Sequence, residues 1–324
     1  MKYASTDSLA LQIRSGADIG YKGARRIPTG SLILDRITNG GYPVGYVSQV
    51  KGKENGGKTT SLIITAGKTI RSGGTVLWVA GERPDLVWAR RCNCPVLFDA
   101  EELADLSGDD LEEALLYNEL HPEAARFVLL VGKYGNKVFE AVVRAVETNA
   151  FDFIVIDSIT VFRKQSSLDT KETGAESRGG EAKLINDFCT RMESAFNYIE
   201  SRRGKLLDKK FRCEYCEGIF DIKKDHKSCP KSKSKAKSKP SKMEVYGELG
   251  GEVRTAIVAV NQIRDQGLDG FSSKKPDAGG GRGLKHAKAL DLDFSYTVPV
   301  TTSIGALSVT YAQRTSVYVT KSKV

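Results

Sequence analysis

The chain has 324 residues, of which 40% are hydrophobic and 27% charged, and its formal net charge is +9. This length allows one large domain or two ordinary ones with a sizeable core, and the composition is typical of globular proteins. No run approaches the ~18 apolar residues of a membrane span, and the N-terminal residues lack the apolar segment of a signal peptide. We therefore expect a cytoplasmic protein without a membrane partner.

The charges are distributed unevenly along the chain. Residues 202–242 hold 15 Lys/Arg and 5 Asp/Glu, whereas residues 92–125 hold 10 Asp/Glu and no Lys/Arg. A basic balance favours nucleic acid or another anionic surface as the partner. The alternative interpretation of a charge run is a solvated face with no partner.

From residue 31 onward, short apolar runs alternate with helical segments. A short helix is expected at 7–14, strands at 45–50, 75–80, 127–131, 153–156 and 255–260, and helices at 61–71 and 136–147. Buried strands separated by helices indicate an α/β fold with a mostly parallel sheet and helices on both faces.

Three segments interrupt this alternation. They are an acidic insertion at 92–125, expected to be helical around 110–118, a basic insertion at 204–243 with a Lys/Ser-rich tail, and a Gly-rich loop at 264–283. Low-complexity and Gly-rich runs bury little, so we expect the tail and the loop to be mobile. The predicted organisation is an N-terminal segment at 1–28 acting as an oligomerisation arm, a core formed by 29–203 and 244–324, and the insertion at 204–243.

The segment 52–59 fits the phosphate-loop pattern G-x-x-x-x-G-K-[ST] and lies between a predicted strand and a predicted helix. Glycines let backbone N–H groups curl around phosphate oxygens, and a helix N-terminus adds partial positive charge. Lys58 would reach the β- and γ-phosphates and Thr59 would hold Mg²⁺. The alternative is a chance Gly-rich turn. The predicted ATP-binding residues here are Gly52, Lys53, Glu54, Asn55, Gly56, Gly57, Lys58, Thr59 and Thr60.

Two carboxylates complete the predicted site. Asp157 ends an apolar strand, where it would act on Mg²⁺ through a water molecule; the alternative is a helix cap. Glu82 follows the strand at 75–80 and is the candidate for orienting the attacking water. Its alternative is a surface acid paired with Arg83.

A metal site is predicted in the basic insertion. Its ligands would be Cys213, Cys216, His226 and Cys229, in the spacing C-x₂-C followed by H-x₂-C. Three thiolates and an imidazole form a closed tetrahedral set typical of structural Zn²⁺, and a metal would give this polar segment a core. The alternative is free thiols in a disordered loop. Cys92 and Cys94 have no partner pair and are expected to be structural.

Taken together in chain order, the motifs resemble the bacterial RecA recombinases and their phage relatives. The resemblance rests on the segments 27–35, 51–60, 80–82, 154–158, 261–264, 280–285 and 319–323, and covers roughly 27–91, 127–200 and 254–324. The departures from the family include the short N-terminal segment, which replaces the long helix that packs between subunits, and Ala80, which stands where many members have an acid. The two insertions also have no counterpart in the typical bacterial protein.

The resemblance implies a RecA-like P-loop ATPase core and a role for several further residues. Glu82 would be the catalytic base, Asp85 and Trp88 would contact adenine, and Gln262 would sense the γ-phosphate. Lys321 and Lys323 alternate along one strand face and would reach the ATP of the neighbouring subunit, so ATP would lie at subunit interfaces. The alternative for the lysine pair is a solvated basic terminus.

The same resemblance places two DNA-binding loops near 164–180 and 265–281. The candidate DNA-binding residues are Lys164, Arg178, Phe271, Lys274, Lys275, Gly280 and Gly281. Lysines neutralise phosphates, and an aromatic ring can stack on bases. The alternative is an ordinary flexible loop with one exposed Phe.

The implied function is an ATP-dependent recombinase that forms helical filaments on single-stranded DNA and pairs it with double-stranded DNA, in a bacterial or phage-infected cell. The second hypothesis is a DNA-stimulated ATPase of the same superfamily that acts as a helicase-like or accessory loading protein without strand exchange.

Overall fold

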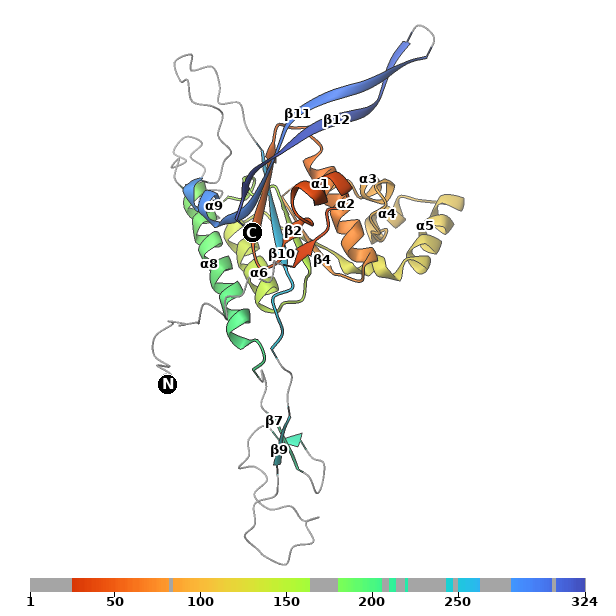
Figure 1. Ribbon diagram of the computed structural model, residues 1–324. Coiled ribbons are helices and arrows are strands. Elements are labelled where there is room, and N and C mark those ends of the chain that lie inside the picture. Colours follow the sequence, from red (N-terminus) through yellow and green to blue (C-terminus); the bar gives the residue numbers. More distant parts are fainter. Residues whose placement is uncertain are drawn as a thin grey trace, which may run out of the picture.

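The computed structural model describes residues 25–81, 84–163, 180–205, 210–213, 219–220, 243–246, 250–262, 281–304 and 307–323. In chain order (Figure 1) its elements are β1 (Arg26–Ile27), α1 (Leu32–Ile37), β2 (Tyr42–Pro43), β3 (Val47–Gly52), α2 (Lys58–Arg71), β4 (Val76–Ala80), α3 (Leu86–Arg91), α4 (Ala100–Ala104), α5 (Asp109–Leu120), η1 (Pro122–Arg126), β5 (Phe127–Val131), α6 (Gly135–Glu147), β6 (Phe153–Asp157), α8 (Gly180–Arg202), β7 (Lys210–Cys213), β8 (Ile219–Phe220), β9 (Met243–Tyr246), β10 (Ala256–Gln262), α9 (Gly281–Ala287), β11 (Lys288–Ile304) and β12 (Leu307–Ser322).

A seven-stranded sheet forms the centre of the molecule, in the order β12-β11-β3-β10-β6-β4-β5. All neighbouring strands are parallel except β11 and β12, which form an antiparallel hairpin at one edge. The inner strands β4, β6 and β10 are almost entirely apolar and buried, as expected for strands covered on both faces. The predicted α/β class with a mostly parallel sheet is confirmed.

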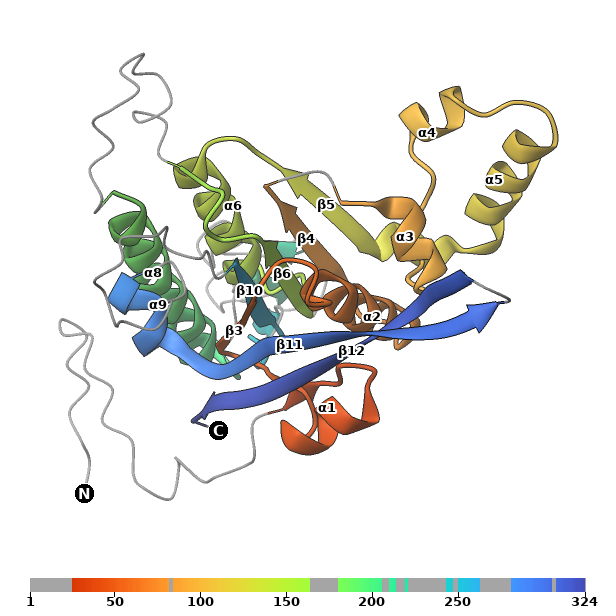
Figure 2. The ribbon, with the colours of Figure 1, turned by 90° about the horizontal axis from the view of Figure 1, so that it is seen from above.

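Helices cover both faces of this sheet. Figure 2 shows α2 on one face and α6 with α8 on the other. Helix α6 buries Val138, Phe139, Val142, Val143 and Val146, which recur every three or four residues and so share one face. This apolar stripe explains why the segment packs on the sheet as a helix.

The acidic insertion is folded. Residues 99–123, which we name the acidic arm, contain α4, α5 and the first two residues of η1. Asp99 and Glu102 form a reciprocal capping box at α4, and the guanidinium of Arg90 lies 3.6 Å from the centre of the Phe98 ring. These contacts anchor the arm at its base. The predicted helix around 110–118 is confirmed by α5, whereas α4 was not anticipated.

Most of the hairpin of β11 and β12 was not predicted from the sequence, which indicated a strand only around Lys321 and Lys323. Its first part pairs with β3 as far as Phe294, and the remainder pairs only between the two strands. Figures 1 and 2 show this remainder extending beyond the sheet. The distal residues Leu307 and Tyr311 are 71% and 66% exposed.

The basic insertion carries a separate three-stranded sheet in the order β8-β7-β9. Its two ends meet where Arg203 bridges to Gly250 and where Gly204 N–H donates to Gly250 O at 2.7 Å. The insertion therefore leaves and rejoins the core at one point. Among the described residues, the helices lack the combination of length and apolar character that crossing a bilayer requires.

Candidate nucleotide-binding site

The segment between β3 and α2 forms a tight loop. Gly57 has φ 81° and Asn55 φ 56°, both left-handed. A Cβ atom on Gly52 would lie 2.4 Å from the carbonyl oxygen of Phe294, so only glycine fits where β11 passes the loop. The helix starts at Lys58, three residues earlier than predicted, because Gly57 turns the chain directly into it.

The N-terminus of α2 has no side-chain cap, and the first N–H groups of any helix lack intrahelical partners. These donors open toward the loop that holds Lys53, Glu54, Asn55 and Gly56. The geometry fits a compact anion such as a phosphate, because N–H groups and the positive end of the helix dipole converge there.

Lys58 folds back into this loop. Its ammonium donates to the carbonyl oxygen of Gly52 at 3.0 Å and to that of Lys53, and the residue is only 6% exposed. Burial lowers the pKa of Lys58, while the charges of Asp157 and Glu54 oppose that shift. The direct contacts of this ammonium are neutral carbonyl oxygens, and phosphate oxygens would add a directly bound counter-charge.

Thr59 and Asp157 meet across the loop. The Thr59 hydroxyl donates to Asp157 Oδ2 at 2.8 Å, joining the first turn of α2 to the end of β6. Hydroxyl and carboxylate oxygens are the ligands that Mg²⁺ prefers in proteins. The donor set therefore fits Mg²⁺, and Lys58 with the loop N–H groups fits a nucleotide phosphate.

Helix α3 brings an aromatic ring to the same place. Asp85 caps the helix by accepting from Trp88 N at 2.8 Å. The indole N–H of Trp88 donates to the hydroxyl of Thr60 at 3.2 Å, and the residue is 44% exposed. Trp88 is thus fixed beside the phosphate loop with a face available to solvent.

Gln262 lies at the same edge of the sheet. It ends β10 and pairs in register with Gly52 of β3. Because carboxyl ends of parallel strands meet at one edge, Gln262, Asp157 and the phosphate loop converge although they are far apart in sequence.

The two C-terminal lysines lie on the edge strand. Lys321 Nζ donates to Lys285 O at 2.5 Å, and Lys323 Nζ donates to His286 O at 2.6 Å, so both ammonium groups face the end of α9. Desolvation and the neighbouring charges of Lys323 and Lys288 lower the pKa of Lys321. Strand β11 separates this pair from β3 within one chain.

Several predicted residues lie outside the described part of the chain. They are Glu82, Lys164, Arg178, Phe271, Lys274, Lys275, Gly280, Cys216, His226 and Cys229. Cys213 ends β7. Within the described residues, no group of three or more His, Cys, Asp or Glu side chains has a metal-binding arrangement.

The expected mobile loop at 264–283 needs a correction at its end. Gly281 is the first residue of α9, and a Cβ atom on Gly283 would lie 2.7 Å from Asn186 Cα of α8. Leu284 is 1% exposed. The last three residues of the expected loop are therefore helical, because α9 packs closely against α8.

The sequence patterns also missed a charged cluster behind the phosphate loop. Buried Lys288 donates to Gln49 Oε1 at 2.8 Å and to Asp291 Oδ2 at 2.7 Å, and Lys51 lies 3.4 Å from Asp291 and 3.6 Å from Asp293. The cluster ties β3 to the root of the hairpin. The alternation of Leu290, Asp291, Leu292 and Asp293 was a signal for a strand with one charged face.

Comparison with known proteins gives distant matches. No family model matches the chain. It is 26% identical over 188 residues to the RecA protein of Ureaplasma parvum, covering 56% of this chain and 48% of that protein. It is 28% identical over 172 residues to RecA of Enterococcus faecalis (53% and 41%) and 30% identical over 161 residues to RecA of Prochlorococcus marinus (49% and 35%).

The chain thus spans about half or less of the length of these relatives. Identity at this level over half the chain, repeated in RecA proteins of different bacteria, supports a RecA-like family for this protein.

Proposed function

We propose that this protein is a RecA-type P-loop ATPase that forms filaments on single-stranded DNA and promotes homologous pairing and strand exchange. The observation that carries the proposal is the convergence of Lys58, Thr59 and Asp157 at the carboxyl edge of a parallel sheet, in a chain similar to RecA proteins. Such a protein acts on DNA in the cytoplasm of a bacterial or phage-infected cell.

The residues of the site would divide the work as follows. When bound, MgATP supplies the γ-phosphoryl group that is transferred to water. Lys58 and the N–H groups of the loop would hold its phosphates, Thr59 and Asp157 its Mg²⁺, and Trp88 with Asp85 its base. Glu82, one residue after Gly81, would orient and deprotonate the attacking water.

The remaining assignments concern DNA and the neighbouring subunit. Gln262 would transmit the state of the γ-phosphate to the loop that follows it, where Phe271, Lys274, Lys275 and Gly280 would contact DNA. The loop before α8, with Lys164 and Arg178, would provide the second DNA contact. Lys321 and Lys323 would complete the ATP site of an adjacent subunit, as a cation supplied in trans stabilises transition-state charge.

The test compares the wild type with Asp157→Asn and Glu82→Gln. We expect single-stranded DNA to stimulate ATP hydrolysis by the wild type, and Asp157→Asn to need much more Mg²⁺ because a neutral amide binds the cation poorly. Glu82→Gln should retain ATP binding and lose turnover. Hydrolysis that DNA does not stimulate would contradict the proposal.

Exchange of a strand between circular single-stranded DNA and a homologous duplex separates the two candidate functions. A recombinase should give joint molecules and, in electron microscopy, open helical filaments. DNA-stimulated hydrolysis with closed rings and no joint molecules would favour the helicase-like or loading function.

The trans assignment has its own test. Lys321→Ala with Lys323→Ala should bind ATP as the wild type does but lose DNA-stimulated hydrolysis and filament formation. A mixture with Lys58→Ala should regain part of the hydrolysis, because a mixed interface can pair an intact loop with intact lysines. Mixed filaments without any hydrolysis would contradict the assignment.

We also propose a structural Zn²⁺ held by Cys213, Cys216, His226 and Cys229, supported by their spacing. Protein purified without chelator should contain about one zinc ion per chain by elemental analysis. Cys213→Ser should lose the metal while the ATPase remains active, because the insertion joins the core at one point. Metal-free wild-type protein would contradict this site.

A further inference from the structure

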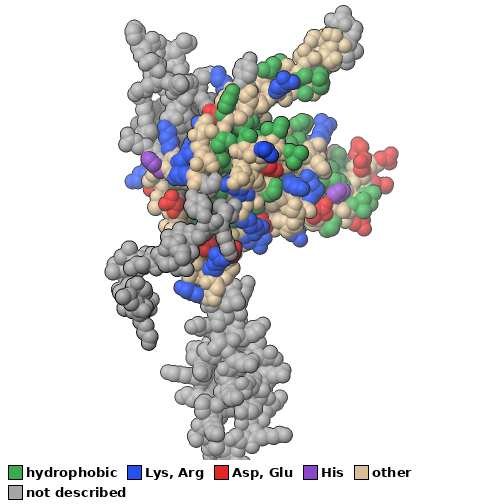
Figure 3. All heavy atoms as spheres, in the orientation of Figure 1, with side chains coloured by type: hydrophobic (Ala, Val, Ile, Leu, Met, Phe, Trp, Pro, Cys, Tyr) green, Lys and Arg blue, Asp and Glu red, His purple; other side chains and the backbone are tan. Residues whose placement is uncertain are grey.

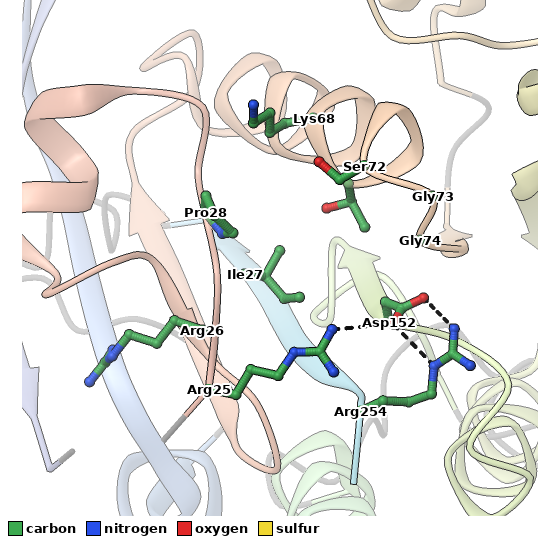
Figure 4. A pocket seen from close by; sticks show the side chains of 11 residues that line it. Arg25, Arg26, Ile27, Pro28, Lys68, Ser72, Gly73, Gly74, Asp152 and Arg254 are labelled. Atoms are coloured by element: carbon green, nitrogen blue, oxygen red, sulfur yellow. Dashed lines mark hydrogen bonds and ion pairs between the residues drawn. The ribbon is translucent and has the colours of Figure 1, made fainter. Parts of the chain in front are cut away.

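A second concave site lies at the amino ends of the parallel strands, whereas the phosphate loop lies at their carboxyl ends. A hollow of about 230 Å³ is formed by β1, the C-terminal end of α2 and the residues that precede β4, β6 and β10. Figure 4 shows Arg25 and Arg254 on either side of Asp152, with Lys68 and Ser72 on the helix across the hollow.

The positive charge of the hollow exceeds its negative charge. Asp152 is buried and neutralised by Arg254, whose Nε and Nη2 donate to the two carboxylate oxygens at 3.0 and 2.6 Å. Arg25 lies 3.9 Å from the same carboxylate with a side chain that is 64% exposed, and Lys68 is exposed. Arg25 and Lys68 therefore remain available to an anionic group from outside.

Apolar side chains adjoin these cations. Ile27 and Pro28 line the hollow, and Gly30 packs on α2 so that its Cβ would lie 3.0 Å from Ile64 Cγ2 and 3.8 Å from Lys68 Cβ. Just beyond it, Leu32 and Ile33 of α1 are 89% and 76% exposed. We name the surface formed by Arg25, Lys68, Leu32, Ile33 and Ile64 the basic face.

The acidic arm has the complementary chemistry. Its helix α5 begins with Asp109 and Asp110, and only Ala114 of its residues is buried. Leu115, Leu116 and Leu120 are 50%, 52% and 64% exposed. Figure 3 shows acidic side chains gathered where α4 and α5 project from the body. Exposed leucines among carboxylates suit a surface that offers both cations and apolar groups.

The arm points away from the hollow of its own chain (Figures 1 and 2). Arg126, three residues after the arm, donates to the carbonyl oxygen of Gly73 at the rim of the hollow and so fixes the chain where the arm ends. Figures 1 and 2 show α5 extending away from the body. The basic face is therefore open to an arm from another molecule.

We propose that the acidic arm of one copy docks on the basic face of a second copy. Carboxylates of α5 would pair with Arg25 and Lys68, and Leu116 and Leu120 would cover Leu32 and Ile33. A nucleic acid would satisfy the cations but leave the exposed leucines of the arm and the exposed Leu32 and Ile33 in water, so a second chain fits the observations better. This proposal stands apart from the ATPase function, because it requires neither nucleotide nor DNA.

The experiment is sedimentation velocity of the full chain without nucleotide, at about 50 mM and about 500 mM salt. We expect reversible self-association that salt weakens. Arg25→Glu with Lys68→Glu, and separately Glu112→Lys with Glu113→Lys, should each weaken it roughly tenfold or more, because like charges then face each other. Mixing the two variants should restore association, since the reversed charges are again complementary.

Matched controls reverse charges on α8, away from both surfaces. Lys183→Glu with Arg191→Glu, and Asp187→Lys with Glu193→Lys, should associate as the wild type does. A second pair of variants, Leu116→Gln and Leu32→Gln, tests the apolar contact and should weaken association at both salt concentrations.

Three results would overturn the proposal: a wild type that stays monomeric, charge-reversed variants that associate normally, or a mixture that fails to recover. If Arg25→Glu with Lys68→Glu lowers affinity for single-stranded DNA and leaves self-association unchanged, the basic face belongs to nucleic acid.

Discussion

The two ends of helix α2 lie at opposite ends of the parallel strands, and each end would attract an anion through different groups. At the N-terminal end, the helix N–H groups adjoin the phosphate loop, and the buried ammonium of Lys58 lies within it. At the C-terminal end, the helix presents carbonyl groups, and the exposed side chains of Arg25 and Lys68 must supply all the attraction. The first arrangement suits a compact polyanion in a dry site, and the second a broad, salt-sensitive protein contact.

The largest effect is expected at the N-terminal end. Lys58→Ala should weaken the binding of a slowly hydrolysed ATP analogue about 100-fold, because a hydrogen bond to a charged group contributes up to ~3 kcal/mol. Calorimetric titration measures this, with Lys183→Ala on α8 as the matched control. Unchanged affinity would remove Lys58 from the site. Since burial lowers the pKa of Lys58 below 10.5, affinity should begin to decline at a lower pH than for an ordinary lysine.

The next effect concerns the buried pair at the other end. Arg254→Ala should lower the free energy of unfolding by roughly 1–3 kcal/mol, because it removes the ion-pair partner of the buried Asp152 carboxylate. The loss is limited because the Arg254 side chain is partly exposed, so solvent already screens the pair. Urea unfolding measures this. Adding Asp152→Asn should recover part of the loss, whereas affinity for ATP should hardly change. A double variant less stable than Arg254→Ala would contradict the account.

The middle of α2 offers a test of packing between the two ends. Alanine normally stabilises a helix by ~1 kcal/mol over glycine. At Gly67, however, a Cβ atom would lie 2.8 Å from both Asn93 O and Cys94 Cα. Gly67→Ala should therefore lower the melting temperature, opposite to the intrinsic preference, and Lys68→Ala on the exposed face should leave it nearly unchanged. A stabilised Gly67→Ala would show that residues 93–94 yield to the helix.

The last effect, which depends on pH, is a decline in stability under alkaline conditions. Burial raises the pKa of Cys94 beside α2, and of Cys189 in α8, from 9.0 to about 12. At a pH between 9 and about 12, the two thiols are deprotonated in the unfolded chain and protonated in the folded chain. The free energy of unfolding should therefore fall as pH rises above 9. Replacing both cysteines with alanine should flatten this decline in urea titrations from pH 8 to about pH 10.5. If the free energy of unfolding falls equally with pH in the wild type and in the double variant, the two thiols are not its cause.

The sequence pattern predicted the helices, strands and turns that depend mainly on residues close together in the chain. The run Phe127–Val131 is β5 as expected, and the alternation around Val138 and Val142 placed α6 within one residue of its start. The phosphate-loop motif also predicted a helix after Gly57, because a glycine in the left-handed region and a following helix are local features. Asp85 was assigned to adenine, and its role as the cap of α3 was missed, although an Asp three residues before a helical N–H is a known signal.

Long-range pairing could not be predicted in the same way. The distal part of the hairpin of β11 and β12 carries a local signal, because Leu307, Val309 and Tyr311 recur at every second position, but this pattern does not say which strand β12 pairs with. The charged cluster of Lys51, Lys288 and Asp291 exists only because β11 pairs in parallel with β3. The paired residues Val47 and Lys288 are 241 positions apart in the sequence.

The sequence by itself determined the chemistry of this protein: an α/β core, a phosphate-loop motif with Lys58 and Thr59, and a segregation of charge into acidic and basic segments. Tertiary structure alone decided which of these groups meet. Thr59 reaches Asp157 across 98 positions of the chain, and the hollow joins Arg25, Lys68, Asp152 and Arg254 from four separate segments. The physical reason is that side-chain identity and local backbone preference are encoded over a few residues, whereas strand order and register follow from packing of the whole core.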